Sequence, residues 1–349
     1  MKTKSLLLGS AAALFAVTGA RAADAVIIPE PEMVEYVRVC DAAGTGYFYI
    51  PGTETCLKIG GYVRFQINAD TDPLVDELPY EDSTGYVDFD TKVSLQVSSW
   101  TDSEIGPIAT FYELVQTAYD ESGLSIDSAY ISFAGLKMGY FGGFLDNGIN
   151  GETDSNGLSN KFNTIQYTGT AGALSFGLAI DELDHDEIAV WTHEDGVQFG
   201  VSGMLGYTVG GVAATLSGAY DTLAEEWVLV ARASAEVGMG TLQGRFTWAS
   251  GFSAYNDTTI DGSPMDWVAE ASYAAKVNDK LTLTPGFSYA HSDGGDNFWR
   301  AGLTADYTIA ANLAAKLSVQ YEDFNDDWSG PGDDSYNGFN GFLRFQASF

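Results

Sequence analysis

Apolar and polar side chains alternate in a series of stretches that each cover about ten residues. The last nine residues, GFLRFQASF, place Leu343, Phe345 and Phe349 on one side and Arg344 and Gln346 on the other. A period of two residues is that of a β-strand, whose successive side chains point to opposite faces. One face of such a strand suits an apolar medium, and the other suits water.

The same alternation recurs from Leu57 to the end of the chain. The stretch LKIGGYVRFQIN alternates apolar residues with Lys58 and Arg64, and VDFDTKVSLQVSS alternates them with Lys92. Each stretch is long enough to cross a bilayer as a tilted strand, which needs about 9–11 residues. Beyond the N-terminus no segment has helical periodicity or approaches the roughly 18 apolar residues of a spanning helix. The pattern predicts about sixteen strands, an even number, as in bacterial outer-membrane barrels.

The connections between these stretches fall into two classes. Short turns alternate along the chain with longer polar stretches, as expected if one rim of a barrel has tight periplasmic turns and the other has external loops. Brief turns are expected near residues 135, 169–172, 210–211, 238–240, 278–279 and 311–312. The longer stretches are residues 69–85, 142–161, 182–195, 251–264 and 323–337.

Aromatic residues mark both expected rims, as amphipathic rings do at the two interfaces of a bilayer. The rings expected to face outward near the loop rim are Trp227, Trp248, Trp267, Tyr289 and Tyr321, and those near the turn rim are Tyr207, Tyr307 and Phe349. A β-sandwich could bury the same rings, but it needs a second apolar layer for every strand to cover. It also leaves the two classes of connection unexplained. We therefore predict an all-β fold, a transmembrane antiparallel β-barrel.

The N-terminus has the features of a secretory signal peptide. Lys2 and Lys4 precede an apolar run, and Ala20-Arg21-Ala22 supplies a cleavage site of small residues. The sequence thus predicts a signal peptide over residues 1–22, a periplasmic segment over 23–56 and a barrel over 57–349, in an exported protein of the bacterial outer membrane. The formal charge of −32, which becomes more negative when the signal peptide is removed, excludes nucleic acid as a partner.

Two cysteines, Cys40 and Cys56, lie in the predicted periplasmic segment. In an oxidising compartment a disulfide between them is the expected state, and it would contribute about 3 kcal/mol by the chain-entropy model. The alternative is two free buried thiols. The loop between the cysteines is either a small periplasmic hairpin or a plug at the mouth of the pore.

Residues 37–67, VRVCDAAGTGYFYIPGTETCLKIGGYVRFQI, closely resemble the N-terminal signature of the alphaproteobacterial porin family of rhizobia and brucellae. The signal peptide and both cysteines fit this family, and the similarity of pattern extends over essentially the whole chain. The resemblance implies a trimeric porin of sixteen strands whose third external loop folds into the pore. That loop corresponds to about residues 142–161, and it would bring Asp146, Glu152 and Asp154 towards the barrel wall.

The wall itself is predicted to be basic. Strand parity assigns seven basic side chains to the inner face, and a lipid-facing Arg or Lys at the midplane would cost about 2–4 kcal/mol. They are Lys58, Arg64, Lys92, Arg245, Arg300, Lys316 and Arg344. Opposed to the acids of the loop, these residues would create a transverse field that admits small hydrophilic solutes. Alternatively, they only neutralise lumenal acids such as Asp88 and Asp90.

The acidic loops, such as DELDHDE and YEDFNDDWSGPGDD, favour a mild preference for cations. The same charge could instead solvate the surface or bind divalent ions that bridge lipopolysaccharide. Other expected partners are membrane lipid, a homotrimer and the barrel-assembly machinery, since the last strand ends in Phe349 and resembles its recognition signal.

A passive diffusion porin is the leading functional hypothesis. A substrate-specific channel would need an ordered track of aromatic or basic residues, and an adhesin would function with the pore closed. An enzyme would need a convergent Ser, His and acid cluster, and no such motif, cofactor signature or metal-ligand spacing is present. The sequence therefore predicts a channel without a cofactor or a metal.

Overall fold

The computed structural model describes residues 37–71, 86–118, 123–154, 158, 161–183, 198–257, 259–260, 263–325 and 336–349. Residues Val39–Phe349 form one compact unit, and only residues 37 and 38 of the preceding unit, Met1–Arg38, are described. The predicted signal peptide therefore lies outside the described residues. Among the residues described, no helix has the length and apolar character needed to cross a membrane.

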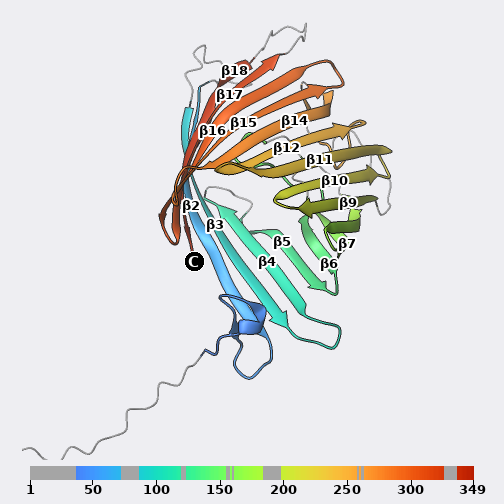
Figure 1. The fold of residues 1–349 in the computed structure, drawn as a ribbon, viewed down its shortest axis with the longest axis vertical. Coiled ribbons are helices and arrows are strands. Elements are labelled where there is room, and N and C mark those ends of the chain that lie inside the picture. Colours follow the sequence, from blue (N-terminus) through green and yellow to red (C-terminus); the bar gives the residue numbers. More distant parts are fainter. Residues whose placement is uncertain are drawn as a thin grey trace, which may run out of the picture. The chain divides into compact units, whose positions relative to one another are not determined.

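In the described part of the chain, sixteen antiparallel strands are hydrogen-bonded into one closed barrel, as the sequence predicts. Strands that follow one another in sequence are paired, and the last strand pairs back with the first, so these strands leave no free edge (Figure 1). They are β2 (Cys56–Asp70), β3 (Tyr86–Thr101), β4 (Ile108–Thr117), β5 (Ser125–Phe133), β6 (Leu136–Gly142), β7 (Lys161–Ala171), β8 (Leu174–Glu182), β9 (Phe199–Val209), β10 (Val212–Asp221), β11 (Glu226–Val237), β12 (Gly240–Ala249), β14 (Ser263–Lys276), β15 (Leu281–Ser292), β16 (Asn297–Ala310), β17 (Leu313–Asn325) and β18 (Tyr336–Ser348).

Within the described ranges, two short strands and one helical turn flank the barrel. β1 (Phe48–Tyr49) pairs with the start of β2, β13 (Thr259–Ile260) pairs with β14, and a 3-10 turn covers Asp41–Ala43. Cys40 and Cys56 form the predicted disulfide, with their Cα atoms 6.0 Å apart. The chain between the two cysteines is thus a small hairpin that continues β2.

The connections follow the predicted division into short and long, with two exceptions. Short turns join β5 to β6, β7 to β8, β9 to β10, β11 to β12, β14 to β15 and β16 to β17. On the opposite rim, however, residues 222–225 and 293–296 make links of only four residues. In the first link Asp221 Oδ1 accepts hydrogen bonds from the backbone N–H groups of Leu223 and Ala224, at 2.9 and 3.0 Å. This capping allows a tight reversal where the alternation alone does not predict one.

The outer face of the barrel is apolar and carries the predicted rings. Trp227 lies 5.0 Å from Trp248 and Trp267 lies 5.2 Å from Tyr289, measured between ring centroids on neighbouring strands. Tyr321 continues this series near the start of β18. Because these rings lie close to the long-loop ends of their strands, they form a belt at the level where a bilayer interface is expected.

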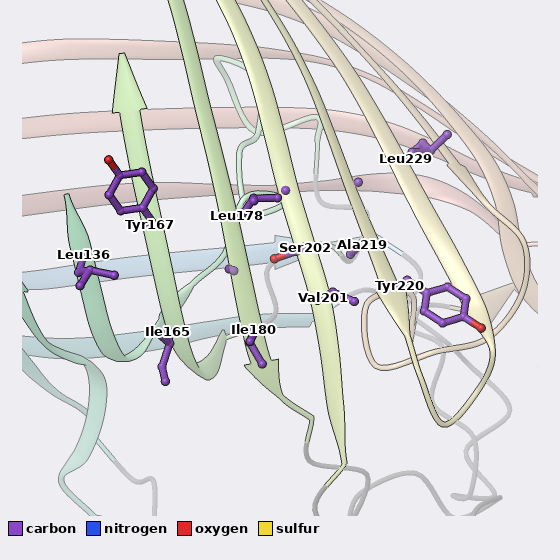
Figure 2. A pocket seen from close by; sticks show the side chains of 13 residues that line it. Leu136, Ile165, Tyr167, Leu178, Ile180, Val201, Ser202, Ala219, Tyr220 and Leu229 are labelled. Atoms are coloured by element: carbon purple, nitrogen blue, oxygen red, sulfur yellow. The ribbon is translucent and has the colours of Figure 1, made fainter. Parts of the chain in front are cut away.

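A groove of about 630 Å³ interrupts the outer face across β6 to β11. Leu178, Ile180 and Val201 line it and are visible beside the strands in Figure 2. It is hollow because Gly203 and Gly218, which face each other in the register of β9 and β10, have no side chains. In a membrane this groove faces the lipid.

Candidate functional site

The inner face of the barrel carries charged and amide side chains. In the strand register Arg64 on β2 lies opposite Gln346 on β18 and opposite Lys92 on β3. Arg64 Nε and Nη2 both donate to Gln346 Oε1, at 3.0 and 2.9 Å, so these side chains share one face. Their sequence neighbours Val63 and Phe65 are exposed on the other face. The register therefore places Arg64 and Lys92 side by side on the face of the wall opposite to these exposed apolar side chains.

Two of the predicted basic residues are neutralised by acids of the wall. Arg245 on β12 forms an ion pair with Glu270 on β14, and Arg300 on β16 forms one with Glu322 on β17. The side chains of Arg245 and Glu270 are 4% and 0% exposed, so neither charge is accessible to a solute. Buried charges of this kind need their partners, because removing one leaves the other desolvated and unpaired.

Residues 143–160 connect β6 to β7. The described part of this connection contacts β12, β15 and β17, which are not neighbours of β6 or β7 in the barrel. We call its described part, residues 143–154, the crossing segment. It begins after Gly142, the last residue of β6. The Phe144 ring packs over Gly177 on β8 so closely that a methyl group at position 177 would overlap the ring. At its far end the backbone N–H of Asn150 donates to Gln243 Oε1 on β12, at 2.6 Å.

Glu152 is the charged residue that fixes the far end of the crossing segment. Its Oε1 lies 2.6 Å from Lys316 Nζ on β17 and 3.9 Å from Arg344 Nη1 on β18. Its backbone oxygen also accepts a hydrogen bond from Gln320 Nε2 at 2.5 Å. Thr153 packs against Gly286 on β15, where a side chain would collide with it. The crossing segment therefore packs against a glycine of the wall, Gly286, and forms hydrogen bonds with two of its amide side chains, Gln243 and Gln320.

The other two predicted acids of the loop have different surroundings. Asp154 Oδ2 accepts a hydrogen bond from the backbone N–H of Ile149 at 2.7 Å, so this carboxylate closes a turn inside the segment itself. Asp146 is exposed and forms no ion pair with any described residue. The structure thus brings Glu152 to the predicted basic wall, and it does not bring Asp146 or the Asp154 carboxylate into an ion pair there.

The remaining wall charges do not pair as a simple neutralisation hypothesis expects. Asp88 and Asp90 both accept hydrogen bonds from Asn68 Nδ2, at 3.3 and 3.1 Å, rather than from a cation. No described carboxylate lies within ion-pair distance of Lys92. Lys58 lies apart from the others, with Nζ 5.9 Å from the centroid of the Tyr47 ring in the disulfide hairpin.

Sequence reasoning missed the acids and amides that organise the wall, among them Glu270, Glu322 and Gln243. The alternation of side chains along each strand, which predicted the inward basic residues, also assigns these acids and amides to the inner face. It also missed residues 250–257, which follow β12. This segment is read as an external loop in the sequence, but Ser253, Tyr255 and their neighbours are almost completely buried.

Comparison with known sequences identifies the family of this barrel. A family described as "Porin subfamily" matches residues 24–341. The chain is 38% identical to outer membrane protein IIIA of Rhizobium leguminosarum bv. viciae, over 97% of this chain and 93% of that protein. It is 35% identical to the porin Omp2b of Brucella canis, over the full length of both.

Solved structures of outer-membrane proteins share the fold. The outer membrane channel DcaP of Acinetobacter baumannii superposes with a TM-score of 0.67 at 14% identity, covering 86% of this chain and 99% of that one. The trimer form of OmpT from Vibrio cholerae superposes with a TM-score of 0.57 at 12% identity, covering 85% of this chain and all of that one. The chain belongs to the porin subfamily of outer-membrane proteins that is represented in rhizobia and brucellae.

Proposed function

We propose that the barrel is a water-filled channel through which small hydrophilic solutes and ions cross the outer membrane by passive diffusion. The observation that carries this proposal is the separation of chemistry between the two faces of each strand. Arg64, Lys92 and Arg344 share one face of the wall, whereas Val63 and Phe345 are exposed on the opposite face. A barrel of sixteen strands is wide enough for an aqueous lumen, and membership of a porin family assigns the chain to channels rather than enzymes.

We further propose that the crossing segment forms the constriction of this channel. Its contacts with β12, β15 and β17, although its ends belong to β6 and β7, support a path across the lumen. Because Glu152 pairs with Lys316, the segment is held against one side of the wall. The solute path then lies between this segment and the strands that carry Arg64 and Lys92.

Ion selectivity follows from the charges that remain accessible. Arg245 and Arg300 are neutralised by neighbouring carboxylates, and Lys316 and Arg344 share Glu152. Asp146 and Asp88 form no ion pair with any described residue. With 48 acidic residues against 16 basic ones, we propose a mild preference for cations.

The proposed channel function also suggests where the other segments of the chain lie and what they bind. We propose that residues 1–22 are a cleaved signal peptide, that residues 23–56 lie in the periplasm, and that residues 57–349 form the spanning barrel. The outward aromatic belt and apolar face suit lipid and lipopolysaccharide, and the strand that ends beside Phe349 suits recognition by the barrel-assembly machinery. A homotrimer is proposed because the OmpT structure described above is a trimer form.

Planar-bilayer recording with the purified protein tests these proposals. We expect stepwise conductance that scales with salt concentration, and a reversal potential in a salt gradient that is displaced in the direction of cation selectivity. An absence of conductance steps from correctly folded protein contradicts the channel. A reversal potential of the opposite sign contradicts only the cation preference.

A further inference from the structure

Residues 250–257, which we call the tucked segment, turn into the barrel after β12. The burial of its middle, residues 253–256, is unusual for a connection at a rim: Tyr255 and Asn256 are each 3% exposed, and Ser253 is fully buried. The backbone N–H of Ala254 donates to Asp221 Oδ2 on β10 at 3.0 Å. Asn256 Nδ2 donates to the backbone oxygen of Met265 at 2.8 Å, which ties the end of the segment to β14.

The hydroxyl group of Tyr255 binds a buried carboxylate of the wall. Asp181 on β8 is 1% exposed, and its Oδ2 accepts hydrogen bonds from Tyr255 Oη and from Ser202 Oγ, both at 2.7 Å. Its Oδ1 accepts a third from Thr164 Oγ1, also at 2.7 Å. In the described part of the chain no cation pairs with Asp181, so these three hydroxyl donors replace its hydration shell.

Burial raises the pKa of Tyr255 above its ordinary value, and the neighbouring carboxylate of Asp181 raises it further. The phenol therefore stays protonated and remains a donor throughout the pH range in which a protein is handled.

The ring of Tyr255 packs at the start of β7, in the apolar cluster that also holds Leu145 of the crossing segment. It packs over Gly200 on β9, where any side chain would collide with it, and it meets the Phe162 ring edge-on at 5.2 Å between centroids. Phe162 lies at the start of β7, directly after the β6–β7 connection. Tyr255 shares a buried apolar cluster with Leu145 and Leu158 of that connection.

We propose that Tyr255 is a positioning residue for the crossing segment, and that it thereby sets the conductance of the channel. This inference rests on the proposed function. The tyrosine joins β8 and β9, through Asp181 and Gly200, to Phe162 at the start of β7. Leu145 of the crossing segment packs in the same buried apolar cluster. Glu152 holds the far end of that segment on β17, so the two contacts together fix both of its ends.

Single-channel recording of Tyr255 variants tests the inference. Tyr255→Phe keeps the ring and removes the bond to Asp181, whereas Tyr255→Ala removes both contacts. We expect Tyr255→Ala to shift the conductance to larger values and to increase switching between levels, with a smaller effect of the same kind in Tyr255→Phe. Tyr207→Phe, on the exposed outer face, is the matched control and should behave as wild type.

Two further measurements separate positioning from a general structural role. The thermal unfolding of Tyr255→Phe, followed by gel mobility in detergent, should remain close to that of wild type while its conductance pattern changes. Adding Asp181→Asn to Tyr255→Ala should produce no further change in switching, because the bond is already absent. If Tyr255→Phe and any folded Tyr255→Ala conduct as wild type does, the inference is wrong and the channel stands. If the wild-type barrel does not conduct, the proposed function fails instead.

Discussion

At the scale of single residues, strand parity locates a charge but does not reveal its partner. The sequence alone predicts that Arg245 and Lys316 point inward, and the register sets Arg245 opposite Glu270 and Lys316 opposite Asp306. It does not predict that Arg245 forms a buried ion pair with Glu270, or that Lys316 pairs with Glu152 of the crossing segment. Partners across a barrel depend on register and on the course of loops, and a period of two residues carries neither.

The pair between Glu152 and Lys316 leads to a prediction about selectivity. Glu152→Gln removes one negative charge from the proposed constriction and frees Lys316 and Arg344 from their shared carboxylate. We expect the reversal potential in a salt gradient to shift towards anion selectivity. The matched control is Glu104→Gln, which removes an exposed carboxylate from the turn between β3 and β4. Identical reversal potentials in the two variants would contradict the assignment of Glu152.

At the scale of elements, the sequence predicts the strands and most of the division into short and long connections, but it does not predict the course of the long connections. The alternating stretches correspond to strands because only one register keeps every apolar side chain of a strand on the outer face. The tucked segment was read as an external loop because SGFSAYND has the polar and small residues of a turn. Its burial arises from contacts with Asp181, Asp221 and Gly200, which lie on strands distant in sequence. No local pattern encodes such contacts.

The disulfide hairpin yields a prediction at this scale. The hairpin is short: β1 has two residues, which pair with the start of β2 and form a bridge with Val39, and the bond between Cys40 and Cys56 closes it. Closing a loop of this size contributes about 3 kcal/mol by the chain-entropy model. In a Cys40→Ser, Cys56→Ser variant we expect hydrogen exchange to accelerate in residues 41–55 and to stay unchanged in β14 to β17. Equal acceleration throughout the barrel would mean that the hairpin is an integral part of its stability.

At the scale of the whole molecule, the fold follows from the number and periodicity of the strands. An open sheet with one apolar face and two free edges would aggregate, and pairing of β18 with β2 removes both edges. The groove on the outer face of the barrel is lined by apolar side chains such as Leu178 and Val201. The sequence could predict closure from the count of strands, but it could not predict how the crossing and tucked segments share the interior.

The central claim is that successive side chains of each strand face oil and water in turn. The native cysteines are joined in a disulfide, so single cysteines introduced at Phe345 and Gln346 can be labelled selectively. In reconstituted protein, a membrane-impermeant maleimide should modify Gln346→Cys rapidly, and brominated lipid should quench a fluorophore attached to Phe345→Cys. Rapid aqueous modification at position 345 together with lipid quenching at position 346 would contradict the barrel as described.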